Sequence, residues 1–341
     1  MTPAMKPASR LVLFRRLSWF GVALALIVIV MGAWVRLSTA GLGCPDWPGC
    51  YGHISAGAAE QNIDHITQAF PERPFEYAKA VKEMVHRYFA STLGLVCVTL
   101  AGLALWNRKD PQQPIVLPLV LVGLVILQGL LGMWTVTLLL KPLIVTFHLI
   151  GGLTTMSLLA WLAIRGIDQL RLPNNTSDPR LRRFAIIGLV MLAIQIFLGG
   201  WTSSNYAALA CPDFPTCQNS YWPHMDAKDA FVLWRGLGID YEGGVLDHPA
   251  RVAIHFVHRL GAIATALVLG FVAVFAWHKS ANPHVRLAGL IVGIALATQL
   301  ILGPVMVMRG LPLALATAHN GVAALLLLSV VRLVRLSSPS R

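Results

Sequence analysis

The chain has 341 residues, of which 56% are hydrophobic and only 12% are charged, and this balance excludes a soluble globular protein and favours an integral membrane protein. Its net charge of +12 is also found in proteins that bind nucleic acid. The basic residues, however, gather on one side of the apolar stretches, which is a sign of membrane topology. We therefore expect a lipid bilayer around the chain and no nucleic-acid partner.

Eight apolar stretches are long enough to cross a bilayer, since a spanning helix needs about 20 residues. In chain order they cover 17–37, 85–105, 115–137, 143–164, 184–202, 252–277, 286–308 and 313–335. The first stretch also has features of a signal peptide, but the fifth, its counterpart in the second half, cannot be cleaved away, so we retain both as helices. The expected fold is an all-α membrane protein with eight transmembrane helices.

The charges predict which ends of these helices face the cytoplasm. On the side of the N-terminus lie 16 basic and 3 acidic residues, which leaves 11 basic and 12 acidic residues on the other side. Because cytoplasmic connections carry the positive excess, both termini are expected in the cytoplasm. Two long connections, 38–84 and 203–251, then lie outside. Within the first, the stretch 60–82 suits either a short amphipathic helix or a plain connector.

The second half of the chain repeats unusual residues of the first half in the same order. Cys44 and Cys50 recur as Cys211 and Cys217, His86-Arg87 recurs as His258-Arg259, Gln128 as Gln299, and His148 as His319, with offsets of 167, 172, 171 and 171 residues. The simplest explanation is a tandem repeat. We expect two four-helix bundles, formed by residues 1–164 and 165–341.

Four of the five cysteines lie in the outer connections, as two Cys-x5-Cys pairs. An oxidising compartment favours a disulfide within each pair, and the spacing differs from that of zinc sites. Each disulfide could be a structural clip or a redox-active pair, because exposed or strained disulfides tend to be labile. Cys97 has no counterpart in the other half and is expected to be a packing residue.

Four histidines, His86, His148, His258 and His319, fall in the outer parts of four spans. An ionisable residue inside a membrane is costly and is a functional candidate by default. Imidazole binds haem iron, and two helices that face each other across a bundle can offer one nitrogen to each side of a porphyrin. The repeat therefore predicts one paired-histidine haem site in each half. A proton relay stays open, whereas a closed zinc or copper site lacks further ligands.

Arg87 and Arg259 each follow a histidine near the outer boundary. Either guanidinium could bind a haem propionate or simply extend to the membrane interface. Gln128 and Gln299 lie inside spans three and seven, where helix packing is the expected role of an amide.

The two halves differ three residues before the first histidine, where one has Glu83 and the other His255. Glu83 and His86 share a helix face, so a carboxylate there could orient water or accept a proton beside the haem. The alternative is an ordinary acidic residue in the first turn of a helix. His255 could support the haem site, bind a propionate, or replace His258 as the iron ligand.

The chain resembles the haem A synthase family through its repeat of four spans and a set of short motifs. These motifs are Glu83-x-x-His86-Arg87, Thr146-Phe147-His148, His255-x-x-His258-Arg259 and Ala318-His319-Asn320. The resemblance implies an oxidoreductase of the bacterial inner membrane. It would oxidise the C8 methyl of haem O to a formyl group by successive hydroxylations, giving haem A for terminal oxidase assembly.

The resemblance also implies a division of labour between the halves. His258 and His319 would be the iron ligands of a haem b cofactor, and His86 and His148 would address the substrate haem O. Glu83 would be the essential acidic residue. Of the cysteine pairs, Cys44 and Cys50 correspond to redox-implicated cysteines, whereas Cys211 and Cys217 correspond to a structural pair.

One alternative function belongs to a different class. A dihaem b-type carrier between quinol and an outer acceptor would have the same histidines, with both haems permanent and Glu83 incidental. The sequence leaves open the electron donor, the oxygen source and the role of the 218–250 insert. It also leaves open whether the chain forms a homo-oligomer and whether it docks to a haem O synthase.

Overall fold

The computed structural model describes residues 7–171 and 178–338. Eight of its helices are long and apolar enough to cross a membrane, which confirms the predicted all-α membrane fold. They are α1 (Pro7–Leu37), α4 (Tyr77–Trp106), α5 (Val116–Thr137), α6 (Pro142–Arg171), α7 (Pro179–Ser204), α9 (His248–Lys279), α10 (Pro283–Met308) and α11 (Leu313–Leu336). The short helices α2 (Ala56–Glu60), α3 (Ile63–Ala69) and α8 (Ala227–Ala230) lie in the two long connections.

Local sequence explains where several of these helices begin. Asp178 caps α7 by accepting hydrogen bonds from the backbone N–H groups of Arg180 and Leu181. Asn282 caps α10 in the same way. Both caps precede a proline at the first helical position, where the missing N–H needs no partner.

Two helix boundaries differ from those expected. Helix α4 begins at Tyr77, so Glu83 lies in its second turn and the interpretation of Glu83 as a first-turn residue is wrong. Helix α6 continues to Arg171, past the boundary at residue 164 that the sequence predicts between the halves. In both cases the helix carries polar residues beyond its apolar stretch, so hydropathy alone misses its end.

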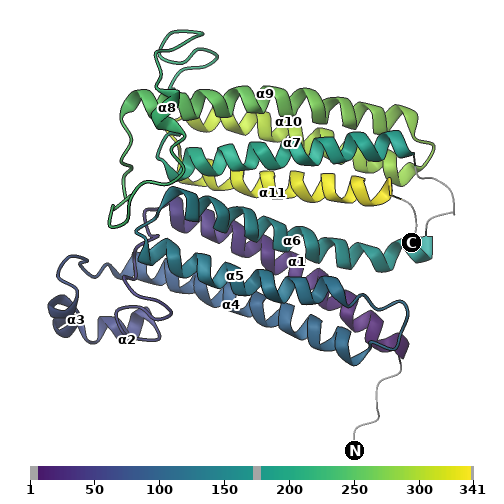
Figure 1. Cartoon of the computed structure of the whole chain (residues 1–341), viewed down its shortest axis with the longest axis horizontal. Helices are drawn as coiled ribbons and strands as arrows, with labels where there is room; N and C mark the ends of the chain where they lie inside the picture. Colours follow the sequence, from purple (N-terminus) through teal and green to yellow (C-terminus); the bar gives the residue numbers. More distant parts are fainter. Residues whose placement is uncertain (1–6, 172–177, 339–341) are drawn as a thin grey trace, which may run out of the picture.

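The long helices form two rings of four (Figure 1). In the first ring α1 packs against α4 and α6, and α5 packs against the same two helices; in the second, α7 packs against α9 and α11, and α10 packs against the same two. Among the described residues, α4 does not contact α6, and α9 does not contact α11. These two pairs therefore lie on the diagonals of their rings.

The two rings share one apolar core. Helices α1 and α6 of the first ring contact α11 of the second, and α6 also contacts α7. A single cluster of buried side chains runs through both rings and includes Ile29, Leu153, Leu192 and Ala324. Because lipid tails are as apolar as leucine, close packing rather than exclusion of water stabilises these contacts.

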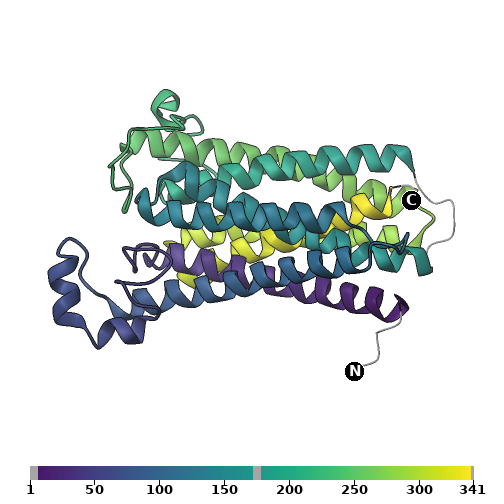
Figure 2. The ribbon, with the colours of Figure 1, turned by 60° about the horizontal axis from the view of Figure 1, so that its bottom comes forward.

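The long connections and the short helices lie at one end of the molecule, opposite the end where α1 begins and α11 ends (Figures 1 and 2). Of the two alternatives for the stretch 60–82, the structure has the short helix, α3, and α2 precedes it. We call the folded part of the first connection the outer lobe. Tyr51 lies at its centre, and the rings of Phe70 and Phe75 pack edge-on against Tyr51. Ile66 of α3 is buried, so the lobe has a small apolar core of its own.

The 218–250 insert reaches from the second ring to the first. Lys141, at the start of α6, donates hydrogen bonds from Nζ to the carbonyl oxygens of Arg235 and Gly236 at 2.6 and 2.7 Å. Its ammonium group also lies 3.6 Å from the centre of the Trp234 ring. Arg73 of the first connection pairs with Asp240 and Glu242. We call residues 234–242 the strap, since they bind the outer ends of both rings together.

Replacement of Lys141 by methionine tests the strap. The change keeps an unbranched side chain but removes the two hydrogen bonds to the carbonyl groups of Arg235 and Gly236. A hydrogen bond to a charged group contributes about 1.5–3 kcal/mol, and less where water can replace it. We expect a lower melting temperature in detergent and faster proteolysis within residues 218–250. Lys109→Met, an exposed lysine between α4 and α5, is the control. Equal melting temperatures for the two variants would contradict the proposed contribution of the strap.

Candidate functional site

A cavity of about 440 Å³ lies inside the first ring, which is within the size range of small-molecule sites. Its lining comes from α1, α4, α5 and α6 and includes Glu83, His86, Gln128 and His148. Ser203 of α7 and Asn320 of α11 border it from the second ring. The structure thus brings together four of the predicted site residues of the first half: Glu83, His86, Arg87 and His148.

His86 and His148 approach this cavity from diagonal helices, α4 and α6. The Nδ1 atoms of both rings are buried and have no hydrogen-bond partner. A buried polar atom without a partner is unusual in a folded protein. In a cavity, such atoms indicate a site for a ligand.

Glycines adjoin the histidines in both rings. A Cβ atom at Gly32 would lie 2.9 Å from Cε1 of His86, and one at Gly132 would lie 3.5 Å from Cε1 of His148. In the second ring the corresponding distances are 3.2 Å from Gly199 to His258 and 3.5 Å from Gly303 to His319. Gly32 and Gly199 are 167 residues apart, the same offset as the cysteine motifs. A side chain larger than hydrogen at these glycines would thus press on the imidazoles or fill the space beside them.

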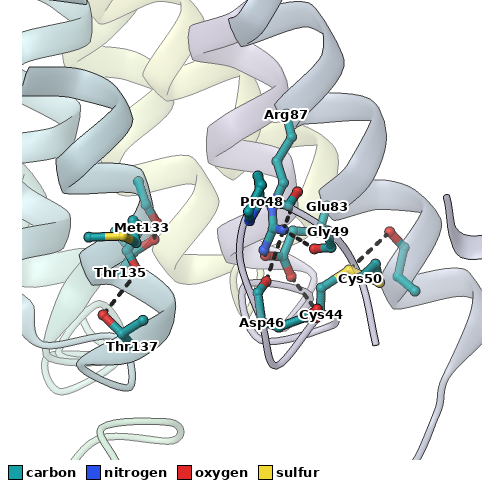
Figure 3. Close-up of polar contacts among 12 residues, drawn as sticks. Cys44, Asp46, Pro48, Gly49, Cys50, Glu83, Arg87, Met133, Thr135 and Thr137 are labelled. Atoms are coloured by element: carbon teal, nitrogen blue, oxygen red, sulfur yellow. Dashed lines mark hydrogen bonds and ion pairs between the residues drawn. A yellow bond between two sulfur atoms is a disulfide. The ribbon is translucent and has the colours of Figure 1, made fainter. Parts of the chain in front are cut away.

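Glu83 is buried, with 5% of its surface exposed, and both of its oxygens have partners (Figure 3). Oε2 accepts a hydrogen bond of 2.9 Å from the backbone N–H of Cys44, and Oε1 pairs with Nη2 of Arg87. Since a carboxylate oxygen can accept two hydrogen bonds, each oxygen keeps capacity for another donor. The carboxylate is therefore held in one orientation at the cavity wall and can still accept a proton.

Arg87 has protein partners that the sequence did not predict. Its Nη1 lies within hydrogen-bonding distance of the carbonyl oxygens of Asp46, Pro48 and Gly49, in the loop closed by the first disulfide (Figure 3). Together with the pair to Glu83, these contacts tie α4 to that loop. Its predicted contact with a propionate stays a prediction, and so does the alternative of an extension to the membrane interface.

The second ring has a similar arrangement with an imidazole in place of the carboxylate. Nδ1 of His255 lies 3.3 Å from the backbone nitrogen of Cys211, and Nε2 lies 3.2 Å from Nε of Arg259. A neutral imidazole accepts at one nitrogen only, so one of the two contacts is a hydrogen bond and the other is simple proximity. Arg259 also donates to the carbonyl oxygens of Cys211 and Thr216. With both nitrogens near protein donors, His255 is placed as the counterpart of Glu83, and its predicted role in cofactor binding stays a prediction.

The two other histidines of the second ring contact amides. Nε2 of Gln195 lies 3.1 Å from Nδ1 of His258 and 3.0 Å from its carbonyl oxygen. Nε2 of Gln299 lies 3.0 Å from Nε2 of His319. The sequence predicted only helix packing for Gln299 and did not single out Gln195. At the offset of 167, Gln195 corresponds to Val28, so the first ring has no such amide.

Both predicted disulfides are formed, between Cys44 and Cys50 and between Cys211 and Cys217, and Cys97 is a buried free cysteine, as expected. An aspartate organises each loop: Asp46 accepts hydrogen bonds from the backbone of Tyr51 and Gly52. In the second loop, hydrogen bonds from the Thr216 hydroxyl and from the backbone N–H groups of Asn219 and Gln218 hold the pKa of the Asp213 carboxyl below its usual value.

Three features of the site escaped the sequence reasoning: Gln195, the glycines Gly32 and Gly199, and Arg36, which lines the cavity from the last turn of α1. The glycines gave a signal in their matched offset. Arg36 was visible only as a charge at the end of an apolar stretch, where basic residues are common.

Comparisons with known proteins agree on one family. A family model described as cytochrome oxidase assembly protein, COX15-CtaA, matches residues 15–331. The chain is 44% identical to the Heme A synthase of Shewanella oneidensis over 306 residues, which cover 90% of this chain and 91% of that protein. It is 27% identical to the Heme A synthase of Rhizorhabdus wittichii over 90% of this chain and 89% of that protein.

Gly32→Ala tests the packing around His86. The added methyl group would force the imidazole to move while the backbone stays in place, so we expect the fold to persist and haem added to the first ring to bind about tenfold more weakly, as for other losses of ligand orientation. Absorbance titration of the purified protein measures this. Gly102→Ala is the matched control on α4, because its Cβ atom would meet nothing within 4 Å. Equal affinities of the two variants for haem would contradict the proposed role of Gly32 in the placement of His86.

Proposed function

We infer the function from one fact: the chain belongs to the COX15-CtaA family of cytochrome oxidase assembly proteins, and Heme A synthases match it over nearly its whole length. It is a multi-pass membrane oxidoreductase that converts haem O to haem A. The finer assignments below, of residues to roles and of each ring to one haem, are our proposal.

The cavity of the first ring is the proposed site of haem O. The observation that carries this assignment is the pair of imidazoles, His86 and His148, each with a buried Nδ1, that line one cavity from diagonal helices with a carboxylate at its wall. Imidazole nitrogens are suitable axial ligands for the substrate iron. Glu83 would then act near the C8 methyl that becomes the formyl group.

The geometry of Glu83 suits a residue that receives protons. Its backbone contact with Cys44 and its ion pair with Arg87 hold the carboxylate in place before substrate binds. Preorganised groups of this kind contribute most when they need not reorient during reaction. The remaining lone pairs of Oε1 and Oε2 would accept protons released during oxidation of the methyl group, or orient water.

The second ring is the proposed site of a resident haem b. His258 and His319 come from diagonal helices, α9 and α11. Gly199 and Gly303 leave space beside their imidazoles. Nδ1 of His319 is buried without a partner. His258 and His319 would hold the haem through their imidazoles, and Gln195 would orient His258, as outer hydrogen bonds commonly do for ligand histidines. Such a haem would supply one-electron redox chemistry.

The proposed orientation follows from charge. The start of α1 and the end of α11 lie at one end of the bundle, with the disulfide loops at the other (Figure 1). With the positive-inside rule, this supports cytoplasmic termini and disulfide loops on the outer face of a bacterial inner membrane. There the Cys44–Cys50 pair adjoins Glu83, which supports the redox role that the family resemblance suggests, whereas Cys211–Cys217 is proposed to be structural.

Loss of the Glu83 carboxylate tests the substrate site. In a strain that depends on this chain for haem A, we expect Glu83→Gln or His86→Ala to abolish haem A and to accumulate haem O, as measured by chromatography of extracted haems. Glu76→Gln, an exposed glutamate paired only with Lys79, is the control and should leave haem A unchanged. Unchanged haem A in the Glu83 variant would favour the dihaem carrier, for which Glu83 is incidental.

The resident haem has a separate test. His258→Ala should remove the b-type haem from the purified protein, whereas His86→Ala should leave it in place. Pyridine haemochrome spectra give the amount of haem per chain. If both variants lost the same amount of b-type haem, both sites would hold permanent haems and the assignment of one ring to substrate would be wrong.

A further inference from the structure

Arg36 is a cavity residue that none of the assigned roles uses. It lies in the last turn of α1 and lines the cavity of the first ring. Nη2 donates a hydrogen bond of 2.8 Å to the carbonyl oxygen of Ser203, and the guanidinium lies 4.1 Å from the centre of the Tyr206 ring. Nε is buried and has no hydrogen-bond partner.

Arg36 forms no ion pair with a described carboxylate, and Glu242, whose charge acts on it, is itself paired with Arg73. Of the described carboxylates, none lies within 4.0 Å of its guanidinium. Glu83, the carboxylate that lines the same cavity, is paired with Arg87. Buried charges are normally paired because desolvation of a lone charge is expensive. A cation in this position therefore favours a ligand that brings a negative group to the cavity.

The comparison of the two rings shows that this arginine is not part of the repeated scaffold. When the two halves are aligned on Gly32 and Gly199, the position of Arg36 is taken by Ser203 in the second half. The arginines that hold the disulfide loops, Arg87 and Arg259, are present in both rings. Arg36 is thus an addition to the ring whose haem must be recognised and released.

We propose that Arg36 binds a propionate carboxylate of haem O and thereby sets the orientation of the porphyrin in the cavity. This inference rests on the proposed assignment of haem O to the first ring. A guanidinium binds a carboxylate through charge-assisted hydrogen bonds in a planar geometry. One propionate of haem O is carried by the same pyrrole ring as the C8 methyl. An anchored propionate therefore limits which methyl group of the porphyrin can lie beside the reacting groups.

The experiment compares two probes that differ at the propionates: iron protoporphyrin IX, which carries them as carboxylates, and its dimethyl ester, in which they are uncharged. The full-length protein, with its resident haem, is purified from cells that make no haem O and is titrated with each probe by absorbance. We expect the wild type to bind the acid about tenfold or more tightly than the ester, the value of one charge-assisted contact. Arg36→Gln should bind both probes with the weak affinity of the ester, and Arg36→Lys should recover part of the preference.

The control is Arg309→Gln, which removes an exposed positive charge after the end of α10 and should keep the full preference for the acid. Equal affinity of the wild type for acid and ester would overturn the role of Arg36 and leave the haem O site standing. The same holds if Arg36→Gln weakens both probes by one common factor, which is the sign of a structural residue. If the wild type binds neither probe, the assignment of haem O to this cavity fails, and the role of Arg36 fails with it.

Discussion

The need to find a partner for each polar group inside a bilayer shapes this molecule more than any other constraint. An unpaired polar atom is costly where no water is available, and most polar side chains at the outer ends of the rings have protein partners. Glu83 binds Cys44 and Arg87, and Gln195 contacts His258. The atoms left over include Nδ1 of His86, Nδ1 of His148 and Nε of Arg36, and all three residues line one cavity. With Gln128, four residues that have such an atom gather at this cavity, while others, such as Tyr241 and Thr265, lie elsewhere.

The two rings share a scaffold and differ at the residues that carry chemistry. In both, an arginine four residues after Glu83 or His255 ties a helix to a disulfide loop, and glycines adjoin the histidines. The differences between matched positions of the repeat are few: Glu83 corresponds to His255, Arg36 to Ser203, and Val28 to Gln195. Beside its cavity the first ring has a carboxylate and, in Arg36, a cation without an ion pair to a described carboxylate, as suits a substrate that is bound and released. The second has an amide that can hold a ligand histidine in place, as suits a permanent group.

Hydropathy and spacing predicted the spans, both disulfides and the histidine pairs, because each depends on local composition or on a repeated motif. What they missed depends on packing between distant segments. Nothing near Arg87 in the chain indicates that it binds the loop at 46–49, and the partner of Lys141 lies in the strap almost a hundred residues away. The start of α4 at Tyr77 was missed because its first turns are polar yet covered by the outer lobe.

The positions of the iron atoms test the central claim most directly. Iron anomalous scattering from crystals of the protein with haem O bound locates each porphyrin without assumptions about its role. The account predicts two iron peaks, one between His86 and His148 and one between His258 and His319. A peak bound to any other side chain, or a first ring with no iron when haem O is supplied in excess, would contradict it.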